Sequence, residues 1–233
     1  MFGFTRGLRP APDTVRAALA DAAGLGPFFT LTLGGPDEGW HPVRLSYARG
    51  MSDLVTRTAA GYGTGEVRVA ASIVQLGHAA RLWSPLLACA AMHGVVPDLT
   101  ALQRADEGTA LRLPAPAGRL AGDLDQATGL LYRIVVNEHL EPLAAGLRVK
   151  IAPRLLYGNA ASALAGAAHA ALTARPGLRV PLTRLTTALL GTGRLAGLGE
   201  ITGPGLTFRR RTCCLYYRVP GGAKCGDCAL TAR

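Results

Sequence analysis

The stretch EVRVAASIVQLGHAARLWSPLLACAAMH, residues 66–93, is the strongest indication of the fold class. Its apolar residues recur at the three- and four-residue intervals of a helix. They are Val67, Val69, Ala70, Ile73, Val74, Leu76, Leu82 and Leu86. Pro85 lacks a backbone N–H, so we expect it to kink or split this element. The stretch therefore predicts a long helical element in the core.

Four other segments also favour helices. Residues 126–148 carry leucine and valine at helical spacing, and residues 152–174 are rich in alanine with leucines between. Residues 181–191 end at a glycine, which commonly closes a helix. Near the start, residues 11–24 are a short helix candidate with a glycine at the end.

Strand signals are short and concentrated near the N-terminus. Residues 26–35 carry Phe, Thr and Leu between glycines, and residues 41–47 are expected to pair with them. Residues 110–123 contain prolines and alternate in polarity, which indicates an irregular or edge strand. The predicted fold class is α+β, mainly α-helical, with a small N-terminal antiparallel sheet.

The composition changes after Gly191. The stretch GTGRLAGLGEITGPG, residues 191–205, is rich in Gly and carries Thr and Pro, as linkers and loops are. We find no internal repeat. We therefore divide the chain into a mainly helical body, residues 1–191, and a C-terminal part, residues 192–233, which joins a linker to a segment with its own chemistry.

The formal charge of +10 suggests a nucleic-acid partner at first sight. However, only Lys150 and Lys224 are lysines among the 25 basic residues, and most of the arginines stand singly. Aromatic residues make up 6% of the chain and do not alternate with basic residues, as a single-strand groove would require. The sequence therefore argues against nucleic-acid binding.

Two charge-free stretches bear on membrane association. Residues 155–174 are too weakly apolar for a membrane span, and residues 82–97 are too short and contain a proline. The first 24 residues lack the apolar run of a secretory signal. We therefore expect no membrane span and a cytoplasmic location, where thiols stay reduced.

Cysteine is concentrated in RTCCLYYRVPGGAKCGDCAL, residues 211–230. Four of the five cysteines lie here: Cys213, Cys214, Cys225 and Cys228. The Cys-Gly-Asp-Cys loop can chelate a metal, and VPGGAK is a turn that lets the chain fold back on the first pair. Four thiolates within 16 residues form a complete Cys₄ set, which suits zinc or an iron–sulfur cluster.

Three kinds of cysteine site compete for this pattern. A reducing compartment argues against disulfides, and adjacent cysteines make a poor internal bridge. Zinc also accepts four cysteines, usually from two spaced chelating loops. Adjacent side chains in an extended segment point to opposite faces, which suits two irons better than one zinc ion. The spacing favours an iron–sulfur cluster, with zinc as the alternative.

Residues 209–230, RRRTCCLYYRVPGGAKCGDCAL, resemble the C-terminal signature of the FhuF family of siderophore-iron reductases. The shared features are an arginine before the cysteine pair, LYYRVPGG between the pairs, and CGDC. Residues 81–99 and 155–167 resemble segments of that family and of the related aerobactin-type siderophore synthetases. The resemblance implies that the four cysteines are ligands of a [2Fe–2S] cluster.

The resemblance also implies a function. The chain would be a ferric siderophore reductase that converts siderophore-bound Fe(III) to Fe(II), which hard oxygen donors hold more weakly. Its partners would be a ferric siderophore and an electron donor such as a ferredoxin or a flavin reductase. The cysteines would be ligands rather than nucleophiles, and no side chain need act as an acid or base. The alternative is a ferredoxin-like electron carrier or an iron-sensing iron–sulfur protein.

Basic and aromatic residues around the cysteines are the candidate substrate- or partner-binding residues. They are Arg209, Arg210, Arg211, Tyr216, Tyr217, Arg218 and Lys224. The positive charges would stabilise a reduced cluster and attract an acidic partner or an anionic chelate. An ordinary solvated face for the basic residues, and shielding of the cluster by the tyrosines, are the alternatives.

Four residues outside the cysteine segment have side chains of the types found in functional sites. Cys89 is expected to be a buried apolar side chain. His78 and His93 lack ligand spacing and are expected to be ordinary core or surface residues. Asn159 either contacts substrate, as the resemblance implies, or caps a local turn.

Overall fold

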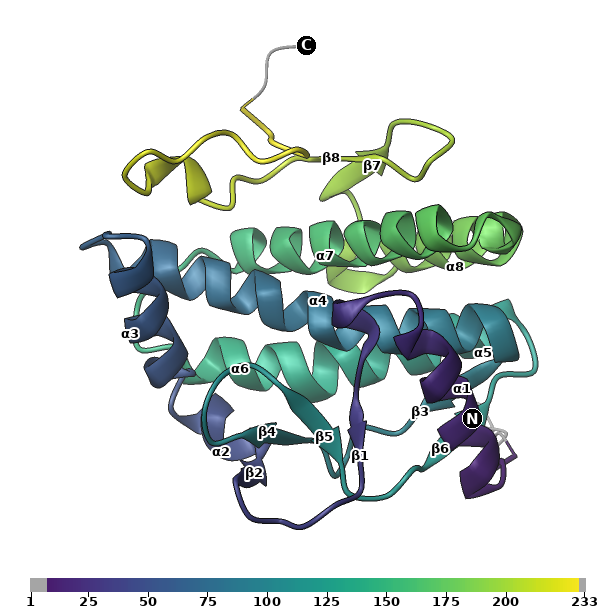
Figure 1. The fold of residues 1–233 in the computed structure, drawn as a ribbon. Helices are drawn as coiled ribbons and strands as arrows, with labels where there is room; N and C mark the ends of the chain where they lie inside the picture. Colours follow the sequence, from purple (N-terminus) through teal and green to yellow (C-terminus); the bar gives the residue numbers. More distant parts are fainter. Residues whose placement is uncertain (1–7, 231–233) are drawn as a thin grey trace, which may run out of the picture.

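The computed structural model describes residues 8–230, which form a mainly helical α+β fold (Figure 1). At its centre, α4 (Val67–His93) and α7 (Pro153–Ala174) pack against each other. The small sheet lies on one side of this pair and the C-terminal segment on the other (Figure 1). The predicted fold class is confirmed.

Helix α4 is one continuous helix, so the split allowed for at Pro85 does not occur. Leu82, Leu86 and Leu87, which flank the proline, are 0% exposed. Burial of these side chains stabilises the helix through tertiary packing, so the hydrogen bond lost at Pro85 does not end it. The helix ends at Gly94, whose φ of 63° suits a left-handed cap.

The remaining helices surround this central pair. They are α1 (Pro12–Ala23), α2 (Val43–Ala48), α3 (Ser52–Gly61), α5 (Leu124–Tyr132), the π-helical stretch η2 (Arg133–Leu140), α6 (Glu141–Gly146) and α8 (Arg179–Leu190). Short 3₁₀ turns occur at η1 (Pro27–Phe29), η3 (Pro176–Leu178), η4 (Gly193–Leu195) and η5 (Tyr216–Arg218). All the predicted helices are present, whereas α2 and α3 were not predicted.

The main sheet has the order β1–β5–β4–β2. Its strands are β1 (Thr32–Leu33), β2 (Trp40–Pro42), β4 (Gln103–Ala105) and β5 (Leu111–Leu113). Strand β1 is parallel to β5, and the other pairs are antiparallel. The expected pairing of residues 26–35 with residues 41–47 is therefore wrong, because β1 and β2 lie at opposite edges of the sheet.

Local chemistry explains why these two segments form so little strand. Pro27 starts the 3₁₀ turn η1, and Gly34 and Gly35 leave the strand with φ of 64° and 87°. Beyond β2, Pro42 precedes α2, whose Val43 and Tyr47 are buried at helical spacing. The predicted second strand is therefore mostly a short helix.

Two further strand pairs complete the structure. Strand β3 (Val95–Pro97) is antiparallel to β6 (Gly118–Leu120), and β7 (Gly199–Ile201) is antiparallel to β8 (Phe208–Arg210). The β7–β8 pair packs on α7 and leads into the cysteine segment (Figure 1).

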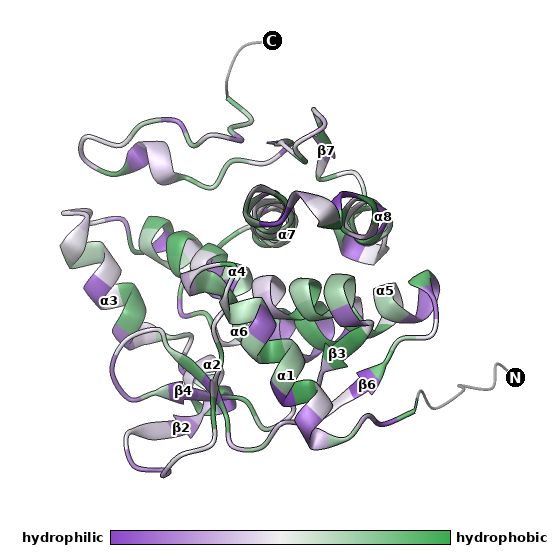
Figure 2. Cartoon of the chain, turned by 45° about the vertical axis from the view of Figure 1, so that its right-hand side comes forward, coloured by the Kyte–Doolittle hydropathy of each residue, from purple (hydrophilic) through white to green (hydrophobic). Residues whose placement is uncertain are grey.

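The hydropathy colours follow the packing of these layers. Hydrophobic residues concentrate in the central helices, and hydrophilic residues are more frequent in the outer strands and loops (Figure 2). Among residues 8–230, no helix combines the length and apolar character needed to cross a membrane.

Candidate metal centre

The cysteine segment folds back on itself and lies against α7. Strand β8 leads to Cys213 and Cys214, and the chain returns beside it, where the Arg210 N–H donates to the Asp227 carbonyl at 3.1 Å. The reversal uses the predicted glycine turn: the Gly222 N–H donates to the Val219 carbonyl at 2.8 Å. This turn brings Cys225 of the second pair beside Cys214 of the first.

The sulfur atoms of Cys214 and Cys225 lie 3.5 Å apart. Two thiolates bound to one tetrahedral metal at about 2.3 Å would lie about 3.7 Å apart, so this pair is already near the spacing of two ligands on one metal. Cys214 and Cys228 are buried, whereas Cys213 and Cys225 are partly exposed. None of the five cysteines, all of which lie in the described part of the chain, forms a disulfide.

Backbone amides also point at the sulfur atoms. The Leu215 N–H donates to Cys213 Sγ at 3.3 Å, and the Leu230 N–H donates to Cys228 Sγ at 3.3 Å. Leu215 adopts a left-handed conformation, with φ of 70°, in the turn that presents its amide. Such amides stabilise negative charge on the sulfur of a metal-bound thiolate.

The thiol pKa values of Cys213 and Cys225 are raised, so a bound metal must displace thiol protons. Burial raises the pKa of Cys213, and burial together with the neighbouring Cys214 raises the pKa of Cys225. Coordination removes the thiol proton, so metal binding at these residues releases protons. Within residues 8–230, no group of three or more His, Cys, Asp or Glu side chains is arranged to hold a single metal ion.

A buried arginine lies next to the cysteines. The side chain of Arg210 is 0% exposed, and its Nη2 donates to Asn159 Oδ1 at 2.6 Å. Its Nε lies 3.9 Å from Asp227 Oδ2, which is too far for a hydrogen bond. Neither Nε nor Nη1 has a hydrogen-bond partner. The positive charge of Arg210 favours the thiolate of Cys213 against the effect of burial.

Polar residues of the helical body hold the segment in place. Ser72 Oγ of α4 donates to the Cys214 carbonyl at 2.8 Å, and Asn159 Nδ2 of α7 donates to Ser72 Oγ at 3.0 Å. Ser162 Oγ of α7 donates to Asp227 Oδ2. The side chain of Asn159 therefore bridges α4 and the C-terminal segment instead of capping a turn.

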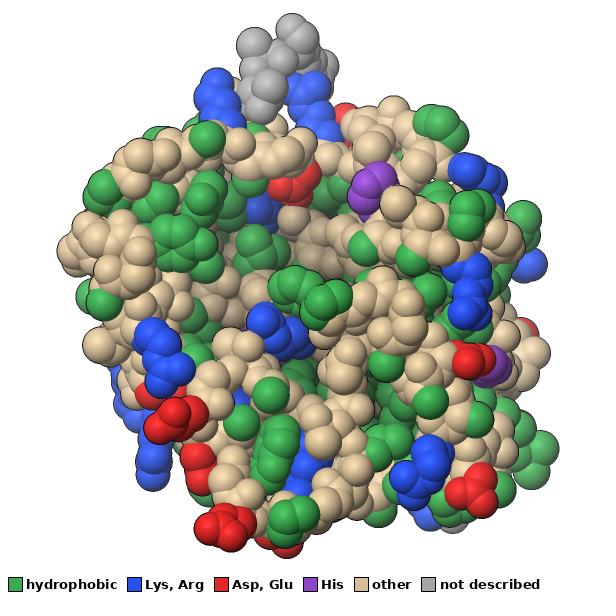
Figure 3. All heavy atoms as spheres, viewed as in Figure 1, with side chains coloured by type: hydrophobic (Ala, Val, Ile, Leu, Met, Phe, Trp, Pro, Cys, Tyr) green, Lys and Arg blue, Asp and Glu red, His purple; other side chains and the backbone are tan. Residues whose placement is uncertain are grey.

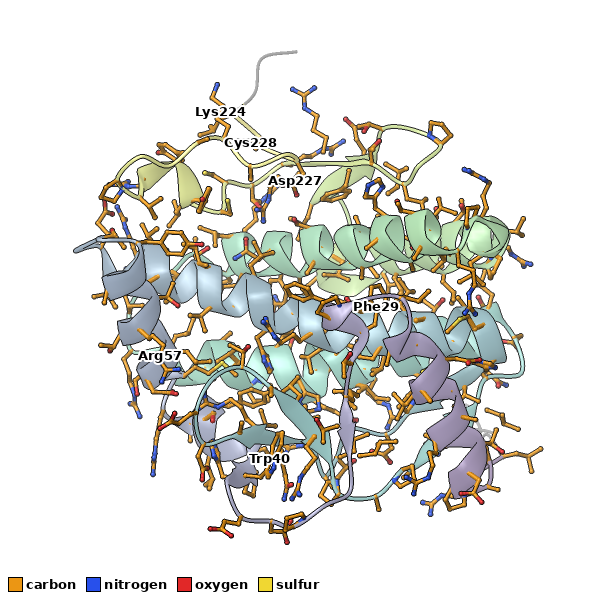
Figure 4. All side chains as sticks on the ribbon, in the orientation of Figure 1. Phe29, Trp40, Arg57, Lys224, Asp227 and Cys228 are labelled. Atoms are coloured by element: carbon orange, nitrogen blue, oxygen red, sulfur yellow. The ribbon has the colours of Figure 1, made fainter. Side chains whose placement is uncertain are left out.

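The other predicted binding residues have different environments. Arg211 is exposed and lies 3.7 Å from Glu200, while Arg218 pairs with Glu66 at 2.7 Å. Arg209 is half-buried, and Tyr217 is exposed. Lys224 is exposed and projects away from the helices (Figure 4). Lys and Arg side chains mark the outer edge of the segment (Figure 3).

Tyr216 contacts the helical body. Its ring packs edge-on against Tyr62, with 5.7 Å between the centroids. The seven predicted residues therefore do not form one surface, because Arg210 lies inside and Tyr216 faces a residue beside α3.

Residues 210–230 match the family model described as FhuF 2Fe-2S C-terminal domain. This segment is a FhuF-type [2Fe–2S] domain. The cofactor of the chain is a [2Fe–2S] cluster, as predicted, and all four clustered cysteines lie within the FhuF domain. No curated protein and no solved structure matches the chain. The upstream resemblance to aerobactin-type siderophore synthetases stays a prediction.

The residues of the FhuF domain fit this cofactor. Four thiols, two amide donors to sulfur and one buried cation with unpaired N–H groups suit an anionic cluster. The sequence did not indicate Ser72 or Ser162 as supports. The Gly-Asn pair at residues 158–159 was the sequence feature that pointed to this supporting surface, because both residues contact the C-terminal segment.

Proposed function

We propose that this protein is a ferric siderophore reductase, an oxidoreductase that delivers one electron to siderophore-bound Fe(III). The FhuF-type [2Fe–2S] domain is the observation that carries the proposal. The partial exposure of Cys213 and Cys225 supports it because a partner could approach them. The C-terminal segment that carries both cysteines lies at the outer edge of the fold (Figure 1).

In this proposal Cys213, Cys214, Cys225 and Cys228 hold the cluster, which when bound supplies one-electron redox chemistry. The 3.5 Å separation of the Cys214 and Cys225 sulfurs would let both thiols serve as ligands of one cofactor. Arg210 supplies a positive charge beside the cysteines, and the amides of Leu215 and Leu230 hold negative charge on sulfur. The reaction needs no proton transfer by a side chain.

The two parts of the chain have different roles in this proposal. The helical body up to residue 191 supports the centre, and the C-terminal part from residue 192 carries it. Exposed Lys224, Arg211 and Tyr217 are available to a ferric siderophore or to an electron donor such as a ferredoxin or flavin reductase. The four thiols must stay reduced until they bind iron, so we place the reaction in the cytoplasm.

Anaerobic mixing tests this proposal. Protein reduced with dithionite, freed of excess reductant, is mixed with ferric hydroxamate or catecholate chelates, and the visible absorption of the cluster is followed beside a ferrous trap. We expect reoxidation of the cluster and one Fe(II) for each cluster. Reoxidation by an oxidised ferredoxin, with no Fe(II) from any chelate, would instead indicate an electron carrier.

A further inference from the structure

A pocket of about 220 Å³ lies next to the cysteine segment, between α3, α4 and the β4–β5 hairpin. Its lining residues are Leu54, Thr58, Tyr62, Ile73, Val74, Gly77, His78, Arg81, Arg104 and Thr109. Leucine, isoleucine and valine form an apolar wall, and threonine hydroxyls and two guanidinium groups provide polar donors. The volume is below the range of about 300–1,000 Å³ for drug-sized ligands, so the pocket suits one arm of a larger molecule.

The charges in this pocket favour an anion. No acidic residue lines it. Arg104 is neutralised by Asp53 at 2.8 Å. Arg81 forms no ion pair within residues 8–230; its Nη1 donates to the Gly77 carbonyl at 3.0 Å, and its guanidinium lies 4.7 Å from the centre of the Phe28 ring.

Arg81 is partly buried, and its contacts are with a carbonyl and an aromatic ring rather than with a carboxylate. Desolvation lowers its pKa, because the charged form loses part of its hydration. His78 adds no charge, because burial lowers its pKa to about 3 and the ring is neutral at pH 7. A carboxylate oxygen at Arg81 would supply an anionic partner.

The pocket shares two walls with the cluster segment. Ser72, which binds the Cys214 carbonyl, directly precedes the lining residue Ile73 on α4. Gly77 lies five residues beyond Ser72, or about 7.5 Å along the helix. On the other wall, Tyr62 lines the pocket and packs against Tyr216, two residues after Cys214.

Two other pockets in the described residues are less suited. The pocket around Ala90 and Gly94 lies at the far end of α4, since Ala90 is about 27 Å along the helix from Ser72. In the pocket around His41, the carboxylates of Asp53 and Asp106 pair with Arg104 and His41, and neither Ser72 nor Tyr62, which approach the cysteine segment, belongs to that pocket. The Arg81 pocket alone of these three combines unpaired positive charge with proximity to the cluster segment.

We propose that the Arg81 pocket binds an anionic arm of the ferric chelate, a carboxylate that is not bound to the iron. The proposal rests on the proposed reductase function and adds the substrate class and the binding site. Arg81 holds the anion, the wall formed by Ile73 and Val74 contacts the organic part of the arm, and the metal end of the chelate faces the cluster segment.

Redox-inert gallium chelates test the site separately from the reaction. Calorimetry on the cluster-loaded protein would use the Ga(III) complexes of two hexadentate tris-hydroxamates, one with a free carboxylate on an arm, which makes it anionic, and one without net charge. We expect the anionic complex to bind at least tenfold more tightly. Arg81→Gln should weaken its binding at least tenfold, and Arg81→Lys should restore most of the loss.

Arg57→Gln is the matched control, because Arg57 is exposed on α3, does not line the pocket, and loses the same charge (Figure 4). It should change the dissociation constant less than twofold. Thr58→Phe, which fills the pocket without changing the charge, should abolish binding and covers the case that Arg81→Gln does not fold.

Equal losses in the Arg57 and Arg81 variants would overturn the site, because they would reflect net charge alone. Unchanged binding in Thr58→Phe, a preference for the uncharged complex, or no binding of either complex would also overturn it. The ferrous-trap experiment decides the reductase function separately: Arg81-dependent binding without reduction would support the pocket and reject the function.

Discussion

The position of Arg210 decides what its charge can do. Its guanidinium is 0% exposed beside the cysteines, whereas Arg211 points to solvent and Glu200. A buried charge is screened much less by water and salt than an exposed one. One arginine of the run from 209 to 211 should therefore dominate the electrostatics of the cluster.

Removing this charge should lower the reduction potential. Reduction makes the cluster more negative, so Arg210→Gln should shift the midpoint down by about 59 mV or more, a tenfold change in the reduction equilibrium. A spectroelectrochemical titration measures the shift. Arg210→Lys should keep most of the wild-type potential, and Arg211→Gln should change it far less. Equal shifts in the two Gln variants would contradict the special role of Arg210.

The clustered cysteines and Cys89 should respond differently to replacement by serine. Cys213→Ser and Cys228→Ser should abolish the cluster absorption and its EPR signal in the reduced state, while circular dichroism of the helices stays unchanged. Cys89→Ser is the control: Cys89 is 0% exposed in α4, and burial raises its pKa to about 12. That variant should keep the full cluster content. Unfolding of both ligand variants would instead mean that the site is structural.

The sequence indicated the segment that holds the four clustered cysteines, but not the separate environments of the three arginines. Side chains on a strand alternate between faces, so a prediction of β8 would have separated Arg210 from its neighbours. The arginine-rich sequence contains no alternation of polarity to reveal that strand. Long-range partners such as Asn159 decide the burial of Arg210, and they lie 51 residues away.

At the scale of elements, α7 is shaped to receive the C-terminal segment. A Cβ atom at Gly158 would lie 1.8 Å from Thr212 Oγ1, so only glycine allows this close approach. On the same helix, Gly166 is exposed, and a Cβ there would meet nothing within 4 Å. These two glycines make a matched pair for mutation.

Gly158→Ala should loosen the segment and Gly166→Ala should not. The first variant should destabilise the protein by about 1–3 kcal/mol through overpacking and speed the loss of the cluster. The second should stabilise it by about 0.5–1 kcal/mol, because alanine favours a helix. Urea titration and the decay of cluster absorption measure both effects. A stabilised Gly158→Ala protein would show that the segment does not dock as described.

Helices were easier to predict than strands for a physical reason. The helices repeat their apolar pattern over many residues, and in α4 the pattern continues through Pro85. The strands are two or three residues long, and β1 pairs with β5 about 80 residues away. Such pairing depends on long-range contacts that a short local pattern cannot encode.

For the whole molecule, two buried histidines link stability to pH. The Tyr47 hydroxyl lies 2.7 Å from His78 Nε2 and 2.9 Å from His139 Nδ1. Burial is the main cause that lowers the pKa of His78 to about 3 and the pKa of His139 to about 4. Near pH 6.5 the two histidines bind protons in the unfolded chain but stay neutral in the folded chain. The contribution of the neutral histidines to the free energy of unfolding is therefore complete above pH 6.5 and is lost as the pH falls toward 4.

The free energy of unfolding should fall between pH 6.5 and pH 4, by up to about 1.4 kcal/mol per pH unit for each histidine. Urea titrations at several pH values measure this slope. His139→Gln should reduce the slope by the contribution of one histidine, up to about 1.4 kcal/mol per pH unit. An unchanged slope in His139→Gln would show that other groups cause the acid sensitivity.

The order of the chain has a consequence for how the protein is made. The surface that receives the cysteine segment comes from α4 and α7, and both helices precede the first clustered cysteine in the sequence. Domains synthesised first can fold first. The helices that carry Ser72, Gly158 and Asn159 can therefore fold before Cys213 leaves the ribosome. We expect cluster assembly to be a late maturation step on this scaffold, and a shortage of iron to leave a folded precursor.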